Sequence, residues 1–386
     1  MIKRYTKKMM KKIKAVFLTG VLTGLLIGCS NNEEIYTDTS QQPIVSFNEE
    51  EDQTFWYFDG ICKVDNGYYL FLDDLLYFCD DKSMQPVLLC TSPNCTHETE
   101  MCNAYFGVYG DELEKGFYTN ILYVFNNNLY TIGYEISDVI DLYLYCISKD
   151  GTERDKVSYL SSLDSEYFIA DYTAHKGFLY KVDDSEGKKC FIRYNMKNCK
   201  QECIMDLSDK VGAGMDSVYG YKNYVYFAAN WFEDEAMSIQ KNMIYRYNID
   251  NGEIETVLED FICNEFQLID ENTLLYYDLD YSIKRLDILT GEEYVIRETK
   301  GEYGLFSYDG TNVYYYDESG DCIEIYDVEG NEIDVIELDN MECYFGDENY
   351  LFAYSYLDNG EVGTYMYLDK KQIGTDNKDW NTLIFN

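Results

Sequence analysis

Short segments in which apolar and polar residues alternate occupy most of the chain, and this pattern predicts β-strands. One Tyr-, Leu- or Val-rich segment recurs after a turn that contains Asn, Gly or Thr. Its copies are residues 66–70, 127–130, 176–180, 222–226, 272–276, 311–314 and 348–352. Tyrosine and β-branched residues favour pleated, half-buried surfaces, and the chain has 41 tyrosines but only three prolines. We therefore expect an all-β protein.

A second element follows several of these segments: an alternating strand, a turn centred on glycine, and another strand. The glycines are Gly151, Gly252, Gly291 and Gly330. Glycine adopts the positive φ that a tight hairpin needs. The period-2 alternation on both sides of each turn predicts antiparallel hairpins.

The two elements together form a repeat. From the second copy of the first segment onward, the copies end 38 to 50 residues apart. Four short strands at this period are typical of a β-propeller blade, whereas a sandwich or an up-and-down barrel does not predict repeated sequence. The fold prediction is a β-propeller of seven four-stranded blades over residues 53–386. Loops that join second to third strands, or one blade to the next, should share one face.

The N-terminus predicts export and a lipid anchor. Seven basic and no acidic residues occupy positions 1–14, and an apolar run, 15–27, leads to Gly28 and Cys29. This is the order of a secretory signal, and the run is too short for a membrane span. The Cys after a small residue resembles the lipobox of bacterial lipoproteins. We expect cleavage of 1–28, lipidation of Cys29 and an acidic tether over 29–52, on the extracytoplasmic face of the cell membrane.

The charge of the chain narrows its partners. The formal net charge is −40, and removal of residues 1–28 takes away seven positive charges, which gives −47. Nucleic-acid binders carry basic faces, so we expect no nucleic-acid partner. We also expect attachment to the membrane through the lipid only, and a monomer. The acidic residues either attract cationic partners or form a solvated surface.

The sharpest local signal is a group of three cysteines and one of the two histidines within thirteen residues: Cys90, Cys95, His97 and Cys102. Tetrahedral zinc accepts a Cys₃His set, but this spacing matches none of the common zinc-finger patterns. A disulfide, for example between Cys90 and Cys102, a structural zinc ion and unpaired thiols all stay open. Four protein ligands would close the coordination sphere, so we do not expect a catalytic metal.

Residues 230–237 form a second candidate site. Trp231 and Phe232 stand beside a run of acidic residues, in a predicted loop on the same face as the Cys/His group. The two rings could stack on a sugar or hold a cationic peptide. The alternative is that they pack over the edge of their blade.

The acidic tether, the Tyr-rich repeats and the Cys/His segment, together with the lipobox, resemble a group of uncharacterised lipoproteins from Gram-positive anaerobes. Their propeller domains are described as TolB-like or as domains of unknown function. The resemblance implies a surface-exposed, membrane-anchored propeller and supplies no catalytic residues.

Known catalytic motifs are missing from the sequence. Two histidines leave little material for a Ser-His-Asp triad, and the chain has no phosphate-binding loop, Rossmann fingerprint or His-Glu-x-x-His motif. We therefore assign no catalytic residue. The function we expect is a binding or scaffolding module for a protein or cell-wall ligand. The alternative is a carbohydrate-active hydrolase or lyase that uses Asp, Glu and Tyr side chains in the central channel.

Overall fold

The computed structural model of the chain describes residues 61–385, with gaps at 73, 100, 108–114, 126–127, 137–138, 164–171, 184–188, 197, 263–264, 299–303, 317–321, 339–340, 348 and 357–361. The chain divides into two compact units, Met1–Gln42 and Pro43–Asn386, and the described residues all belong to the second. Cys29 and the domain boundaries expected after residues 28 and 52 lie outside the described residues.

Seven four-stranded antiparallel sheets make up the described part of the chain, and each is a meander of consecutive strands. The first blade contains β1 (Ile61–Val64), β2 (Gly67–Leu72), β3 (Leu75–Asp80) and β4 (Pro86–Leu88). The second contains β5 (Lys115–Phe125), β6 (Asn128–Ile136), β7 (Ile140–Ser148) and β8 (Arg154–Leu163). The third contains β9 (Tyr172–His175), β10 (Phe178–Asp183), β11 (Cys190–Asn195) and β12 (Gln201–Asp206).

The remaining four blades follow in the same order. The fourth contains β13 (Val211–Tyr221), β14 (Tyr224–Phe232), β15 (Gln240–Asn248) and β16 (Ile254–Glu259). The fifth contains β17 (Phe266–Asp270), β18 (Thr273–Tyr277), β19 (Ile283–Asp287) and β20 (Glu293–Arg297). The sixth contains β21 (Leu305–Tyr308), β22 (Val313–Tyr316), β23 (Cys322–Tyr326) and β24 (Glu332–Glu337). The seventh contains β25 (Met341–Gly346), β26 (Tyr350–Tyr356), β27 (Val362–Asp369), the 3₁₀ turn η2 (Lys370–Gln372) and β28 (Asn381–Thr382).

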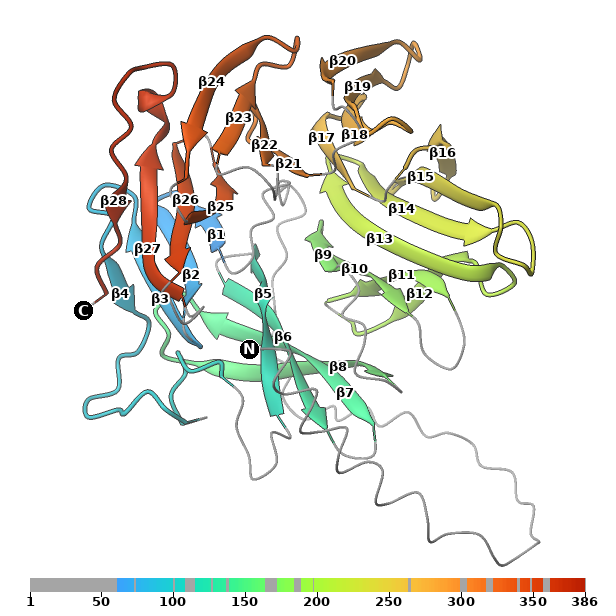
Figure 1. Ribbon diagram of the computed structural model, residues 1–386. Helices are drawn as coiled ribbons and strands as arrows, with labels where there is room; N and C mark the ends of the chain where they lie inside the picture. The colour runs from blue at the N-terminus through green and yellow to red at the C-terminus, as the bar shows by residue number, and fades with distance from the viewer. Residues whose placement is uncertain are drawn as a thin grey trace, which may run out of the picture. The chain divides into compact units, whose positions relative to one another are not determined.

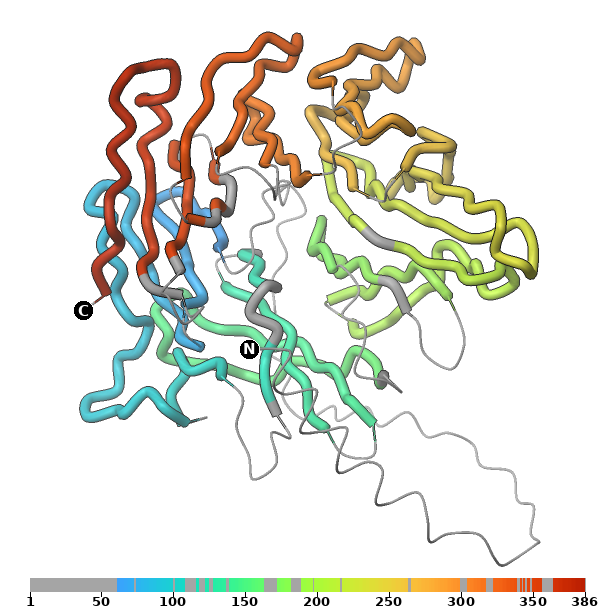
Figure 2. Tube along the Cα trace, in the orientation of Figure 1, coloured from blue at the N-terminus to red at the C-terminus, as the bar shows by residue number. Residues whose placement is uncertain are grey.

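The architecture is the predicted seven-bladed β-propeller, and Figure 1 shows the sheets following one another in sequence order. The Cα trace in Figure 2 passes through the blades one by one. First strands of neighbouring blades, such as β9 and β13, contact one another, so they lie at the centre. The recurrent segment of the sequence forms the second strand of every blade, from β2 to β26.

Second strands are buried because they lie between neighbouring blades. All six residues of β2 are buried, whereas β12, an outer strand, has four exposed and two partly buried residues. The tyrosines that end the recurrent segment are at most 2% exposed in five blades: Tyr130, Tyr180, Tyr226, Tyr276 and Tyr314. Most of them belong to hydrophobic clusters that combine two consecutive blades; Tyr130, for example, shares one with Leu179 of the third blade. Burial of such a side chain contributes about 1.5–3 kcal/mol each.

The ring closes by packing of side chains between the first and seventh blades. Figure 1 shows the blue β2 and β3 beside the red β26 and β27. Leu70 of β2 shares a hydrophobic cluster with Phe352 of β26 and with Leu383. Among the described strands, no sheet mixes strands from the two ends of the chain. Within the described ranges, no helix has the length and apolar character needed to cross a membrane.

Candidate functional site

The predicted Cys/His group lies in the connection from the first blade to the second, between β4 and β5. This segment, residues 89–107, is held by local turns in its backbone. The amide of Cys95 donates to Ser92 O at 3.4 Å, and that of Cys102 donates to Thr99 O at 2.9 Å. His97 has a φ of +58°, in the left-handed region. Non-glycine residues rarely adopt this conformation. The few that do are often found at functional sites.

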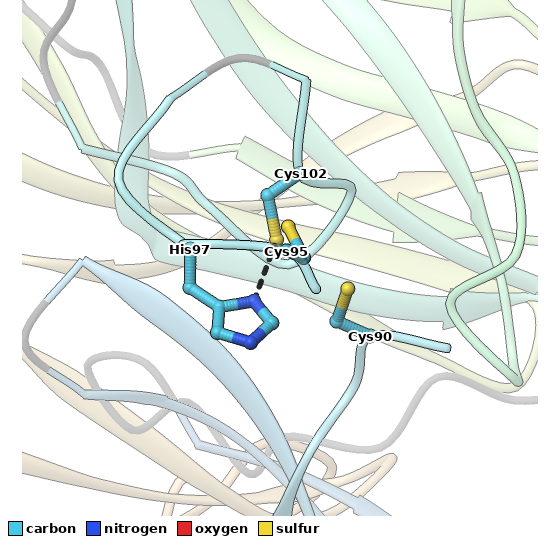
Figure 3. A group of neighbouring side chains, drawn as sticks. All are labelled: Cys90, Cys95, His97 and Cys102. Atoms are coloured by element: carbon cyan, nitrogen blue, oxygen red, sulfur yellow. Dashed lines mark hydrogen bonds between the residues drawn. The ribbon is translucent and has the colours of Figure 1, made fainter. Parts of the chain in front are cut away.

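These turns bring the four predicted side chains together, as Figure 3 shows. The three Sγ atoms and a ring nitrogen of His97 all lie within 4.8 Å of one another. His97 Nδ1 and Cys102 Sγ are 3.3 Å apart. Cys102 is 1% exposed, while the other three residues are partly buried. The site could hold a metal ion.

The cysteines of the group differ in acidity. Burial raises the pKa of the Cys102 thiol to about 12. The pKa of Cys95 is lowered, mainly because the backbone N–H of His97 donates to its sulfur. Cys90, Cys95 and Cys102 are all free thiols in this structure. A metal ion would favour the thiolate form of each cysteine.

Segment 89–107 is fixed to the first blade by backbone hydrogen bonds. Leu76 N donates to Ala104 O at 2.9 Å, and Phe106 N donates to Asp74 O at 2.7 Å. Ala104 and Phe106 are both buried in the cluster that contains Cys102. The site therefore rests on the hydrophobic core and is not a free-standing loop.

The same segment contacts the turn between β7 and β8 of the second blade. The side-chain Nδ2 of Asn103 donates to Gly151 O at 3.1 Å and to Thr152 O at 2.7 Å. Arg154 donates to Tyr105 O, and its guanidinium lies 5.0 Å from the centre of the Phe106 ring. The segment reaches from the second–third turn of the first blade to the third–fourth turn of the second blade.

Trp231 and Phe232 are the last residues of β14, where they pair with Lys241 and Gln240 of β15. The loop that follows them is therefore shorter than the sequence suggested. Trp231 packs against the cluster between the third and fourth blades. Lys210 Nζ lies 5.8 Å from the Trp231 ring centre. These contacts agree with the alternative that the two rings pack over the edge of their blade. Ligand binding by Trp231 and Phe232 stays a prediction.

A polar groove is a further site that the sequence did not predict. Its lining comes from the first–second turns of three consecutive blades, together with the first residue of β14 and the last residue of β15: Lys176, Lys222, Asn223, Tyr224, Asn248, Glu271 and Asn272. Several of these residues begin the recurrent segment, where the sequence indicated only turn formation. The signal that was available is the recurrence itself, because equivalent turns of neighbouring blades lie side by side in a propeller.

Comparisons with known proteins identify the fold. No family model matches the chain, and no curated protein matches it. It is similar to a solved prolyl endopeptidase at 12% identity and a TM-score of 0.57, over 86% of this chain and 51% of that one. Prolyl oligopeptidase B from Galerina marginata gives 11% identity and a TM-score of 0.54, over 85% and 52%. An oligogalacturonate lyase in complex with manganese gives 9% identity and a TM-score of 0.48, over 71% of this chain and 76% of that one.

This chain spans about half the length of the two peptidase chains. At these identities the likeness shows the fold alone. The structural neighbours are β-propeller proteins, and their reactions belong to them.

Proposed function

We propose that this chain is a lipid-anchored propeller on the outer face of a cell membrane, where it binds a protein or a cell-wall glycan. The observation that carries the proposal is the polar groove that three consecutive blades line together. Ligand sites often form where several structural units meet on a rigid frame. The signal-like N-terminus and Cys29 support the location.

The Cys/His group serves this propeller as a structural zinc site. Thiolate sulfur and neutral imidazole are the ligands that structural zinc takes, four at a time. Ligands at about 2.0–2.3 Å from a tetrahedral ion stand about 3.3–3.8 Å apart. The present spread of up to 4.8 Å therefore needs a contraction of about 1 Å, and the His97 and Cys102 atoms already have the required distance. Convergence of all four ligands favours metal over a single disulfide.

Metal analysis tests the zinc site. The full chain is purified under reducing, chelator-free conditions, and its metal content is measured against protein concentration. We expect about one equivalent of zinc. Less than about 0.2 equivalents of any transition metal would contradict the site, and mass mapping of a Cys90–Cys102 bridge in protein purified without reductant would support the disulfide instead.

Site-directed photocrosslinking in intact cells tests the binding function. A photoreactive residue at Asn223, in the groove, is compared with one at Val87, which is 64% exposed on the outer strand β4. We expect a discrete product, with protein or glycan, from position 223 and little from position 87. Equal labelling at both positions would argue against a ligand-binding groove.

The carbohydrate-active alternative needs carboxylates and tyrosines that a substrate can reach. One described convergence of this kind joins Asp309, Tyr314 and Lys370, and the Tyr314 hydroxyl donates to Asp309 at 2.6 Å. Asp309 is 2% exposed and Tyr314 is 0% exposed, so these groups bond to one another inside the protein. The binding module is therefore the function that we favour.

A further inference from the structure

The groove lies where the turns β9–β10, β13–β14 and β17–β18 come together, and it encloses about 480 Å³. This volume is in the range of ordinary small-ligand sites, about 300–1,000 Å³. The three turns belong to the third, fourth and fifth blades. A ligand in the groove would therefore contact a rigid surface composed of three repeats.

The charge of the groove differs from that of the whole chain. Its lining holds Lys176 and Lys222 against one acidic residue, Glu271, in a chain of formal charge −40. Lys176 Nζ donates to Asn223 Oδ1 at 2.6 Å. This partner is an uncharged amide, so it does not neutralise the charge of the ammonium group. Lys222 Nζ lies 3.3 Å from Glu271 Oε2. Both side chains of this pair are more than a third exposed, and such pairs contribute about 0–1 kcal/mol. An incoming anion could displace Glu271 at little cost.

Of the three Asn side chains in the lining, Asn223 donates its Nδ2 to Asp250 Oδ2 at 2.8 Å, and the other two have their oxygens engaged. Arg246 Nη1 donates to Asn272 Oδ1 at 3.1 Å, and the backbone N–H of Asp250 donates to Asn248 Oδ1 at 2.9 Å. With these oxygens engaged, the two Nδ2 groups serve as donors to a ligand. The lining thus combines two ammonium and two amide donors with the single carboxylate of Glu271. This set matches oxygen-rich anions that also carry hydroxyl groups.

Buried groups hold the groove in shape. His175 is 0% exposed, and its Nε2 lies 2.8 Å from Lys222 O, which fixes the backbone of that turn. Arg246 is also buried, donates to Glu271 O at 2.9 Å and lies 4.5 Å from the centre of the Tyr224 ring. A site whose donors are fixed before binding loses less entropy when the ligand arrives.

We infer that this groove binds an acidic saccharide, a sugar unit that carries a carboxylate or a phosphate. The ammonium groups contact the anion, the amides donate to ring or hydroxyl oxygens, and Glu271 accepts from a hydroxyl. This inference rests on the proposed binding function and names its ligand class.

Calorimetric titration of the full chain tests the inference with two matched pairs of probes. The first pair is cellotetraose and the corresponding tetramer of glucuronic acid. The second pair is glucose and glucose 6-phosphate. We expect an acidic probe to bind at least about tenfold more tightly than its neutral partner. The pair that shows this preference identifies the anion as carboxylate or phosphate.

The double variant Lys176→Gln/Lys222→Gln should bind the acidic probe at least about tenfold more weakly than the wild type does. The control, Lys200→Gln/Lys371→Gln, removes the same charge at exposed sites outside the groove and should leave affinity within about twofold. Thermal unfolding verifies that both variants fold. Equal weakening by both variants, or no binding of either acidic probe, would overturn the inference. A crosslink at Asn223 without saccharide binding would leave the binding function standing with another ligand.

Discussion

The hydroxyl of Tyr68, in the first blade, donates a hydrogen bond of 2.6 Å to Oδ2 of Asp347, in the seventh. The two residues are 279 positions apart, and both are buried. Lys63 Nζ lies 3.0 Å from the same carboxylate oxygen. Since no described sheet combines strands from both ends of the chain, this contact and the surrounding apolar cluster close the ring.

Tyr68→Phe should destabilise the propeller by about 1–3 kcal/mol, because it leaves a buried carboxylate without one of its donors. Urea unfolding measures the difference. Tyr294→Phe is the control, since Tyr294 also donates to a carboxylate, that of Glu292, but is 44% exposed. A loss no larger than that of the control would show that the Tyr68 bond does not secure the ring.

The Asp347 contact should also make stability depend on pH. Burial by itself would raise the pKa of Asp347, but donors from Tyr68, the backbone of Tyr350 and Asn349, and Lys63 outweigh it and lower the pKa. A lowered folded-state pKa stabilises the protein above the ordinary carboxyl pKa, about 3.9, and this stabilisation is lost as pH falls through the folded value.

Urea unfolding between pH 3 and 6 tests this dependence. The wild type should lose stability on acidification more steeply than Asp347→Asn, which cannot titrate at this position. Asp209→Asn, at an exposed site, should retain the wild-type slope. Identical slopes for the wild type and Asp347→Asn would contradict the assignment.

Removal of metal should destabilise the connection between the first two blades. If zinc binds only the folded state, saturation at 100 times the dissociation constant stabilises by about 2.7 kcal/mol. Chelation should lower the melting temperature of the wild type but leave that of Cys102→Ser unchanged. Cys203→Ser, at an exposed cysteine on β12, should respond to chelator as the wild type does. A zinc-loaded wild type that ignores chelation would show that the metal does not stabilise the fold.

Gly151 tests how closely segment 89–107 fits the second blade. It has a φ of +70°, and a Cβ there would lie 2.2 Å from Leu89 O. Gly252 has a φ of +76° in the equivalent turn of the fourth blade, with nothing within 4 Å of its Cβ position. Gly252→Ala should cost about 1–2 kcal/mol from backbone strain alone. Gly151→Ala should cost more, by urea unfolding, and equal losses would contradict close packing at this turn.

The features that could be predicted from the sequence are those that depend on a local pattern of residues. Each blade is a contiguous meander, so alternation and turn glycines such as Gly151 were sufficient to locate its hairpins. The Cys/His group was found for the same reason, because its four members lie within thirteen residues. Contacts between blades have no such signal. Asn103 meets Gly151 across 48 positions, and Lys176 meets Asn223 across 47. Only the packing of neighbouring repeats brings these residues together.

The aromatic pair shows a second limit. Tryptophan and phenylalanine beside acidic residues suit either a binding loop or a blade edge, and composition does not separate the two. Trp231 and Phe232 lie in β14 because the strand continues to Phe232, where it pairs with Gln240. Their register was decided by the partner strand and not by their own sequence.

Cys29→Ala should release the protein from the membrane. After removal of residues 1–28 the chain carries a formal charge of −47, which opposes adhesion to an anionic lipid surface, so the lipid alone should hold it. Cell fractionation should find the wild type with membranes and a processed Cys29→Ala chain in the medium. Cys203→Ala keeps the anchor and should stay with the membranes. If the processed Cys29→Ala chain is retained, a protein partner holds the propeller there, and crosslinking from Asn223 would then be the route to identify it.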